Sequence, residues 1–238
     1  MIDKKALGAI IVICFILFAS CTANIEGTLA ADGSASLTLN MSLMQRITAM
    51  IRSIAAAGGQ ESANVLDGAA IARSMSGAAG ITSVTLRNTS PSAVAGQIRI
   101  SNINQFLSAA GSAGGRFIVF EQSTGGGRIE ININRTNGPA VLETLSPEIS
   151  DYLNALMAPI ATGEELTKTE YLELVTSFYN KAISDEIAAS RIRASIDFPG
   201  AIRNVRGGSF TGRRAVFDIP LLDLLVLEAP ARYEVIWN

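Results

Sequence analysis

The sequence predicts an α+β fold in which an antiparallel sheet, built from β-hairpins, packs against amphipathic helices. Apolar and polar residues alternate in pairs of short runs joined by turn residues, which is the pattern of β-hairpins. Between these pairs, apolar residues recur every three or four positions, as they do on one face of a helix. Hydrophobic residues form 48% of the 238-residue chain and charged residues 17%, so the chain can bury a substantial core.

The first half of the chain is expected to contain two hairpins separated by two helices. The expected order is two strands (23–30 and 34–43), two helices (44–57 and 63–80) and two further strands (81–88 and 93–103). Asp32-Gly33 favours a tight turn between the first two strands, and Gly58-Gly59 ends the first helix. Apolar residues of each strand should therefore point to one face of the sheet.

The second half is expected to follow a similar plan. Its elements are two strands (116–122 and 127–135), proline-interrupted helices between 137 and 190, and three strands (191–198, 213–220 and 231–237). The longest helix, 167–190, carries Val175 and Phe178 on a wide apolar face that should pack on the sheet. Residues 199–212 are predicted to form a turn region, and residues 221–227 a buried helical turn or strand.

The two halves leave open whether the chain is a duplication. Residues 23–103 and 116–219 have a similar order of expected strands and helices, but few identical residues. No long polar linker separates them, so residues 21–238 are predicted to form a single α+β domain.

Residues 1–20 have the pattern of a secretory signal peptide. Lys4 and Lys5 precede an apolar run of 14 residues, 6–19, which is too short to cross a bilayer comfortably. Two small residues, Ala19 and Ser20, end this segment. Residues 1–20 are therefore predicted to be removed from the working protein.

The end of this segment resembles the lipobox of bacterial lipoproteins, whose usual form is leucine, two small residues and cysteine. Residues 18–21 read Phe-Ala-Ser-Cys, and Phe18 replaces the leucine, as looser lipoboxes such as those of spirochaetes allow. The resemblance implies cleavage between Ser20 and Cys21, and attachment of diacylglyceryl and acyl groups such as palmitate to Cys21. The alternatives are a plain signal peptide cut elsewhere and a short membrane anchor with an incidental cysteine.

Two further stretches resemble the LppM-type lipoprotein domain. Residues 26–43 match the opening hairpin of that domain, and residues 196–225 match its closing strand, Pro-Gly, glycine-containing turn, strand and apolar stretch. The resemblance implies a compact α+β envelope domain with ligand-binding or envelope-interaction roles.

Several kinds of site are disfavoured by the residue types present. Histidine is absent, which removes Ser-His-Asp and Cys-His catalysis and the commonest zinc ligand. The glycine clusters at 111–115 and 125–127 lack the strand and helix context of a phosphate-binding loop. Glu164-Glu165 and Asp185-Glu186 are expected to be solvated or capping carboxylates. No metal or cofactor is expected, and a net charge of −2 gives no indication of a nucleic-acid partner.

Two groups of arginines are candidate contacts for lipid headgroups or an anionic ligand. Arg46 and Arg52 lie on the first predicted helix, which has no acidic residue and follows the anchor closely. The second group surrounds Gly207-Gly208 and consists of Arg203, Arg206, Arg213 and Arg214. The plainer interpretation is a helix that packs by its Ile and Met face and a solvated turn.

The sequence therefore predicts a non-enzymatic, lipid-anchored protein of the bacterial cell envelope. It would lie on the periplasmic face of the inner or outer membrane, or on the cell surface, and bind a lipid, another apolar ligand or an envelope partner. One alternative is a structural subunit of an envelope assembly. Another is a histidine-free hydrolase that uses carboxylates or a Ser-Lys pair.

Overall fold

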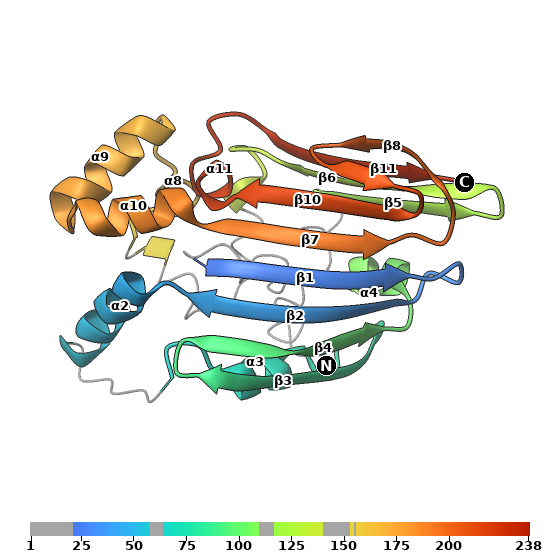
Figure 1. The fold of residues 1–238 in the computed structure, drawn as a ribbon, viewed down its shortest axis with the longest axis horizontal. Helices are drawn as coiled ribbons and strands as arrows, with labels where there is room; N and C mark the ends of the chain where they lie inside the picture. Colours follow the sequence, from blue (N-terminus) through green and yellow to red (C-terminus); the bar gives the residue numbers. More distant parts are fainter. Residues whose placement is uncertain (1–20, 58–63, 110–116, 140–152, 155) are drawn as a thin grey trace.

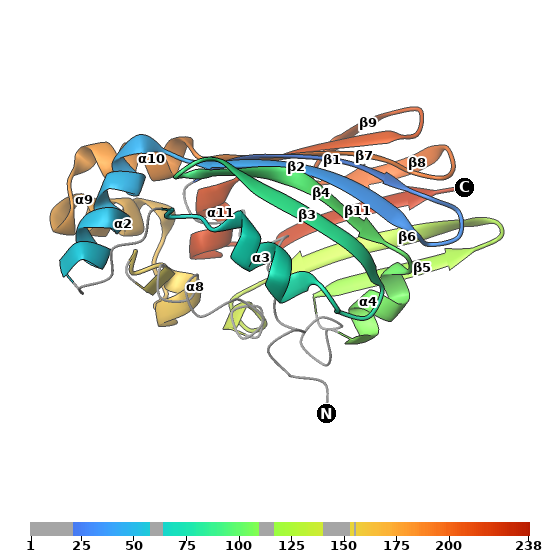
Figure 2. The same ribbon diagram turned by 90° about the horizontal axis from the view of Figure 1, so that it is seen from below.

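The computed structural model describes residues 21–57, 64–109, 117–139, 153–154 and 156–238. Two β-sheets face one another, and helices gather at one end of the larger sheet and beneath it (Figures 1 and 2). The predicted α+β class is confirmed. The single expected sheet is in fact two, because long-range strand pairing divides the hairpins between them.

The larger sheet is centred on the first strand of the domain. In spatial order it contains β3 (Ile81–Ser90), β4 (Ala93–Ile100), β2 (Ala35–Leu43), β1 (Cys21–Leu29), β7 (Arg191–Asp197), β10 (Arg214–Pro220) and β9 (Ser209–Thr211). All its neighbours are antiparallel except β1 and β7, which are parallel. The exception is understandable, since a tight turn forces antiparallel pairing but a long connection does not.

The β1–β2 hairpin forms as predicted around Asp32-Gly33. The Asp32 carboxylate accepts a hydrogen bond from the Ser34 backbone N–H at 2.9 Å, and Gly33 has a φ of +79°. This left-handed conformation carries little steric cost for glycine. The turn fixes a register in which Cys21 pairs with Leu43.

The smaller sheet consists of β5 (Ile118–Ser123), β6 (Gly126–Ile133), β11 (Ala231–Trp237) and β8 (Ile202–Arg206), in that order. The prediction that residues 199–212 form only a turn region was wrong, because they include β8 and β9. These strands are short and mostly exposed, so they lack the apolar alternation that identifies a half-buried strand. Backbone pairing with β11 and β10 defines them instead.

Strand pairing does not support a duplication of the two halves. The expected order of strands and helices along the chain is largely present. However, β1 to β4 all belong to the larger sheet, whereas β5 to β10 are divided between both sheets. The halves are therefore similar in sequence order but not in topology.

The helices are short, and capping residues mark where α9 and α10 begin. They are α2 (Gln45–Ala57), α3 (Gly68–Met75), α4 (Ile103–Ala109), α8 (Pro159–Thr162), α9 (Lys168–Phe178), α10 (Lys181–Ala189) and α11 (Leu221–Val226). Thr167 and Glu170 form a capping box at the start of α9. The single helix predicted over 167–190 was wrong, because Asn180 accepts a hydrogen bond from the Ile183 N–H and starts a separate helix.

Two groups of apolar side chains form the core. Between the sheets pack Leu29, Phe120, Phe198, Ile202, Ala215, Phe217, Val235 and Trp237. Under the other end of the larger sheet, helices α2, α9, α10 and α11 bury their apolar faces. The predicted burial of residues 221–227 is confirmed, since Leu221, Leu224 and Leu225 are fully or almost fully enclosed.

Tyr171 links α9 to this second part of the core and makes stability sensitive to alkaline pH. Its side chain is fully buried, and its hydroxyl donates a hydrogen bond to the Leu156 carbonyl at 3.1 Å. Burial raises the pKa of the Tyr171 hydroxyl well above its usual value, and burial raises the pKa of Tyr233 to about 12. Above pH ~10 the unfolded state therefore loses protons that the folded state keeps, so stability should fall as pH rises.

We expect Tyr171→Phe to lower the free energy of unfolding by about 1–2 kcal/mol near neutral pH, because the Leu156 carbonyl loses its donor. This deficit should shrink above pH ~10, since the variant no longer carries the ionisable group at that site. Urea unfolding of both proteins at neutral and alkaline pH measures the difference. An equal deficit at every pH would contradict the assignment.

Candidate functional site

The backbone of Cys21 opens the middle strand of the larger sheet. Cys21 is the first residue of β1, which has three strands on either side of it. Its backbone is paired with Leu43 at the end of β2, and the next residue, Thr22, is paired with Arg191 at the start of β7. A group attached to Cys21 would thus be joined to the rigid part of the domain with no intervening linker. Ser20, the other residue of the expected cleavage site, lies outside the described residues.

Three helices surround this end of the sheet (Figure 1). The chain enters α2 two residues after Leu43, and it leaves α10 two residues before Arg191 pairs with β1. Helix α10 packs against both α2 and α9. We refer to α2, α9 and α10, together with the start of β1, as the anchor end.

A carboxylate from α10 holds the start of α2 in place. The Glu186 side chain is 17% exposed and accepts hydrogen bonds from the backbone N–H groups of Arg46 (3.1 and 3.2 Å) and Ile47 (3.1 Å). The Arg46 guanidinium lies 3.8 Å from the same carboxylate. Helix α2 has no acidic residue in its own first turn, so Glu186 supplies the missing cap from another helix. Asp185 instead pairs with Lys181 at 2.6 Å on the surface.

We expect Glu186→Ala to lower the free energy of unfolding by about 1–2 kcal/mol, because the backbone N–H groups of Arg46 and Ile47, in the first turn of α2, lose their acceptor. Asp185→Ala is the matched control and should cost under about 0.5 kcal/mol, since an exposed pair contributes little. Urea unfolding of the two adjacent variants measures both values. Equal losses would contradict a capping role for Glu186.

The anchor end also exposes a large aromatic side chain. Phe178 was predicted to pack on the sheet, and this was wrong: its side chain is 66% exposed. Phe178 has the helical spacing of the buried Tyr171 and Val175, but it is the last residue of α9. It therefore lies past the end of the part of the helix that packs on the core. By contrast, the predicted packing of α2 is confirmed, because Ile47 and Met50 are buried.

An open groove of about 450 Å³ lies between α2 and the junction of α9 and α10. Its lining consists of Arg46, Ala49, Met50, Ser53, Phe178, Tyr179, Asn180 and Ile183. The groove therefore combines an exposed aromatic ring, small residues and a guanidinium. Arg52, the other basic residue predicted on α2, is exposed on the same helix.

The second group of arginines lies away from the anchor end. Arg214 faces Asp197 at the end of β7, and its guanidinium donates two hydrogen bonds to that carboxylate at 3.0 and 2.6 Å. The hydrogen bond from Arg214 lowers the pKa of Asp197 below its usual value. Arg213 donates from Nε to the Phe198 carbonyl at 2.9 Å.

The two groups of arginines do not converge on one site. Asp197 is level with Thr28 on β1, six residues from Thr22, which corresponds to roughly 20 Å along the strand. Arg203 and Arg206 are exposed on β8, in the smaller sheet. Of the six arginines predicted as contacts, only Arg46 and Arg52 therefore lie on the helix next to the start of β1.

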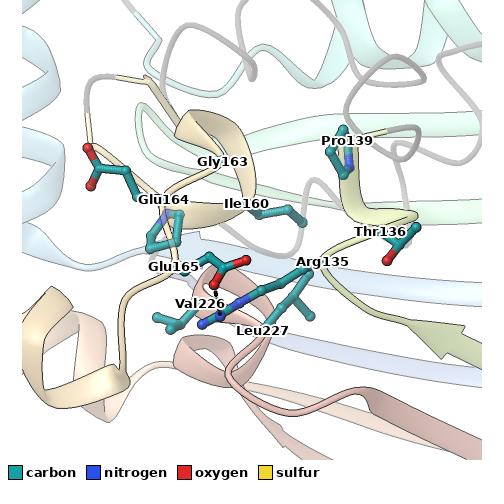
Figure 3. A pocket seen from close by; sticks show the side chains of 10 residues that line it. Arg135, Thr136, Pro139, Ile160, Gly163, Glu164, Glu165, Val226 and Leu227 are labelled. Atoms are coloured by element: carbon teal, nitrogen blue, oxygen red, sulfur yellow. Dashed lines mark ion pairs between the residues drawn. The ribbon is translucent and has the colours of Figure 1, made fainter.

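A second concave site, of about 220 Å³, was not predicted from the sequence (Figure 3). It is lined by Arg135, Thr136, Pro139, Pro159, Ile160, Gly163, Glu164, Glu165, Val226 and Leu227. The Arg135 guanidinium donates to the Leu166 carbonyl at 2.6 Å and lies 4.0 Å from Glu165, while its Nε is buried without a hydrogen-bond partner. Figure 3 shows Glu165 directed at Arg135 and Glu164 pointing away.

This pocket offers one cation beside one carboxylate against apolar walls. These groups could bind a small ligand with both apolar and polar parts. An acidic ligand would have to compete with Glu165 for the Arg135 guanidinium. The lining comes from a strand end, two helices and a loop that are far apart in the sequence, so no local motif could have indicated it. The left-handed backbone of Leu227, with a φ of +50°, could not be predicted either, because leucine rarely adopts this conformation.

Within the described ranges, no group of three or more His, Cys, Asp or Glu side chains is placed to hold a metal ion. In the same part of the chain, no helix is long and apolar enough to cross a membrane.

Comparison with known proteins yields one distant neighbour. No protein-family model and no curated protein matches the chain. The NMR structure of the folded domain of the Mycobacterium tuberculosis LppM protein is similar to 92% of this chain over 90% of its own, with 8% sequence identity and a TM-score of 0.40. At that score the similarity is a distant one, and no residue role is transferred from it.

Proposed function

We propose that this chain is a lipid-anchored, non-enzymatic protein of the bacterial cell envelope, held close to the membrane by Cys21. The observation that carries the proposal is the position of Cys21 at the start of the central strand, directly after the lipobox-like residues 18–20. Attachment at that point would leave no flexible tether between lipid and domain. Because acyl chains contribute about 0.8 kcal/mol for each buried CH₂, two or three chains hold a protein firmly.

Binding is the activity that the exposed features support best. The open groove beside Phe178 and the smaller pocket at Arg135 both present apolar surface with a single guanidinium, which in the smaller pocket lies beside the Glu165 carboxylate, so the open groove is the better site for an acidic group. Such a mixture suits a lipid, another apolar ligand with an acidic group, or an envelope protein. Asp185 and Glu186, which could have served a hydrolase, instead form a surface pair and a helix cap.

A structural subunit of an envelope assembly is the second candidate. The observation that favours it is the side-chain packing between the two sheets, where the Trp237 ring is in aromatic contact with Phe120 and with Phe198. A domain whose centre is packed in this way can serve as a rigid building block without binding a ligand there.

The lipid anchor can be tested by metabolic labelling of the full chain in a diderm bacterium. Cells grown with an alkyne-bearing palmitate analogue should yield a labelled protein that enters the detergent phase on cloud-point extraction. A protein that takes up no label and stays in the aqueous phase would contradict the proposal. Deleting the protein from an assembly and asking whether the assembly dissociates would separate the structural candidate from the binding one.

A further inference from the structure

We propose that the anchor end rests on the bilayer surface, with Phe178 inserted among the headgroups and Arg46 and Arg52 facing anionic phospholipids. The inference rests on the proposed lipid anchor at Cys21 and deepens it by stating which face of the domain the membrane covers. It concerns a contact that the lipid alone does not require, since an anchored domain can also stand free of the surface.

The first argument is the distance between the anchor and the helices. Cys21 is paired with Leu43, and α2 begins at Gln45, only two residues further on. Paired residues of neighbouring strands lie about 5 Å apart, and two more residues add at most about 7 Å. The start of α2 is therefore within about 12 Å of the Cys21 backbone, so a bilayer reached by the lipid is also within reach of the anchor end.

The second argument is the exposure of Phe178. Among the described residues, four large hydrophobic side chains are notably exposed, and Phe178 has the highest value, 66%. It sits on the rim of the groove, beside small residues of α2 such as Ala49. An aromatic ring at the interface between water and lipid gains apolar contact without entering the hydrocarbon core.

The third argument is charge. Helix α2 carries Arg46 and Arg52 and no acidic residue. On α10, Lys181 is neutralised by Asp185, and Glu186 is occupied with the start of α2. Helix α9 adds Lys168, Glu170 and Glu173, so the anchor end as a whole carries four cations and four carboxylates and is neutral. Its positive charge is local to α2. Because basic residues near a bilayer attract anionic phospholipid by about 1 kcal/mol each, anionic phospholipid at this helix is the occupant that we propose.

The far end of the sheet provides an internal control. Phe210, on β9, is also exposed, at 43%. It is paired with Ala215, which faces Ile196 and is level with Gly27 on β1, five residues or roughly 17 Å along the sheet from the level of Thr22. In the proposed orientation, Phe210 stays in water.

The test uses tryptophan as a depth probe in the full, lipidated chain. Phe178→Trp and Phe210→Trp are reconstituted separately into vesicles of phosphatidylcholine with phosphatidylglycerol, in which the acyl chains carry bromine. The native Trp237 is 3% exposed and supplies a constant background that the unsubstituted protein measures. The substitution at 178 should give emission that shifts to the blue and is quenched by about twofold or more, as expected for an indole at the interface. The tryptophan at 210 should be quenched no more than the background of the unsubstituted protein, and its emission should not shift to the blue.

Each outcome decides between the possibilities. Equal quenching of the two variants, in protein that floats with the vesicles and carries an acylated Cys21, would overturn the docking surface and leave the proposed anchor intact. Protein that does not float and has an unmodified Cys21 would remove the anchor and the docking surface together. A blue shift at 178 that appears without vesicles and grows with protein concentration would overturn the inference in favour of a second copy of the chain.

Quenching that is present in anionic vesicles should also weaken in the double variant Arg46→Gln, Arg52→Gln. Both side chains are exposed, so the domain should keep its thermal midpoint. Salt should weaken the quenching as well, because it screens the attraction between arginines and anionic headgroups. Quenching that is the same with and without the two arginines, at every salt concentration, would contradict the proposed preference for anionic lipid.

Discussion

Replacing Cys21 by alanine is expected to make the protein extractable from membranes by alkaline carbonate. The unsubstituted protein should resist the same treatment, because two or three acyl chains contribute far more binding free energy than any surface contact. The apolar run over residues 6–19 is too short to replace them as a stable span. Immunoblots of pellet and supernatant should show at least about a hundredfold change in the partition, since a single acyl chain alone gives an association constant of about 10⁴ M⁻¹.

Cys14→Ala is the matched control for this experiment. It removes the other cysteine of the chain, seven residues earlier, and should leave the protein resistant to carbonate. Release of the Cys14 variant, or retention of the Cys21 variant, would contradict lipidation at Cys21. The anchor-end contact does not obscure the result, because one partly exposed phenylalanine contributes at most about 1.5–3 kcal/mol.

Replacing Trp237 by alanine is expected to lower the free energy of unfolding by about 3–5 kcal/mol. Its ring lies between the sheets, 5.0 Å from the Phe198 ring and 6.2 Å from the Phe120 ring, measured between centroids. A methyl group added at Gly127 would approach the Trp237 ring to 2.3 Å, which shows how closely β6 packs against it. Truncation would leave a cavity that these neighbours could fill only in part.

Urea unfolding followed by circular dichroism measures this loss. Phe210→Ala is the control, because it removes an aromatic side chain that is substantially exposed, and should cost under about 0.5 kcal/mol. A loss below about 1 kcal/mol for Trp237→Ala would mean that the space between the sheets is not held by this ring, since full burial of an aromatic side chain contributes more.

The elements that could be predicted from the sequence are those set by local physics. Asp32-Gly33 defines a turn, and with it the register that puts Cys21 opposite Leu43. The alternation of apolar and polar residues along β2 and β10, and the apolar period of α2, match the burial of one face of each element. Thr167 is followed three residues later by Glu170, and the expected helix start is a capping box.

The features that could not be predicted depend on contacts between distant segments. The parallel pairing of β1 with β7 joins residues about 170 positions apart, and no local pattern specifies it. The division of strands between two sheets has the same origin. The apolar period continues through Asn180, although Asn180 is also a common helix cap, so the sequence does not reveal the break between α9 and α10. The exposure of Phe178, at the end of α9, could not be predicted for the same reason.

The candidate site shows the same division. Arg46 and Arg52 could be placed near the anchor because the hairpin and α2 are continuous in the chain. Arg213 and Arg214 could not be placed relative to it, since their position depends on the pairing of β10 with β7. The Arg135 pocket joins a strand end to α8 and α11, and only the folded chain brings these together.

The mass of the N-terminal peptide tests the central claim most directly. Cleavage of the protein after Glu26 releases residues 21–26, a peptide short enough for its modification to be read in a single spectrum. The account predicts a peptide that begins at Cys21 and carries a diacylglyceryl group on the thiol, with or without an acyl group on the new amino terminus. An unmodified Cys21, or a mature chain that begins at another residue, would contradict it.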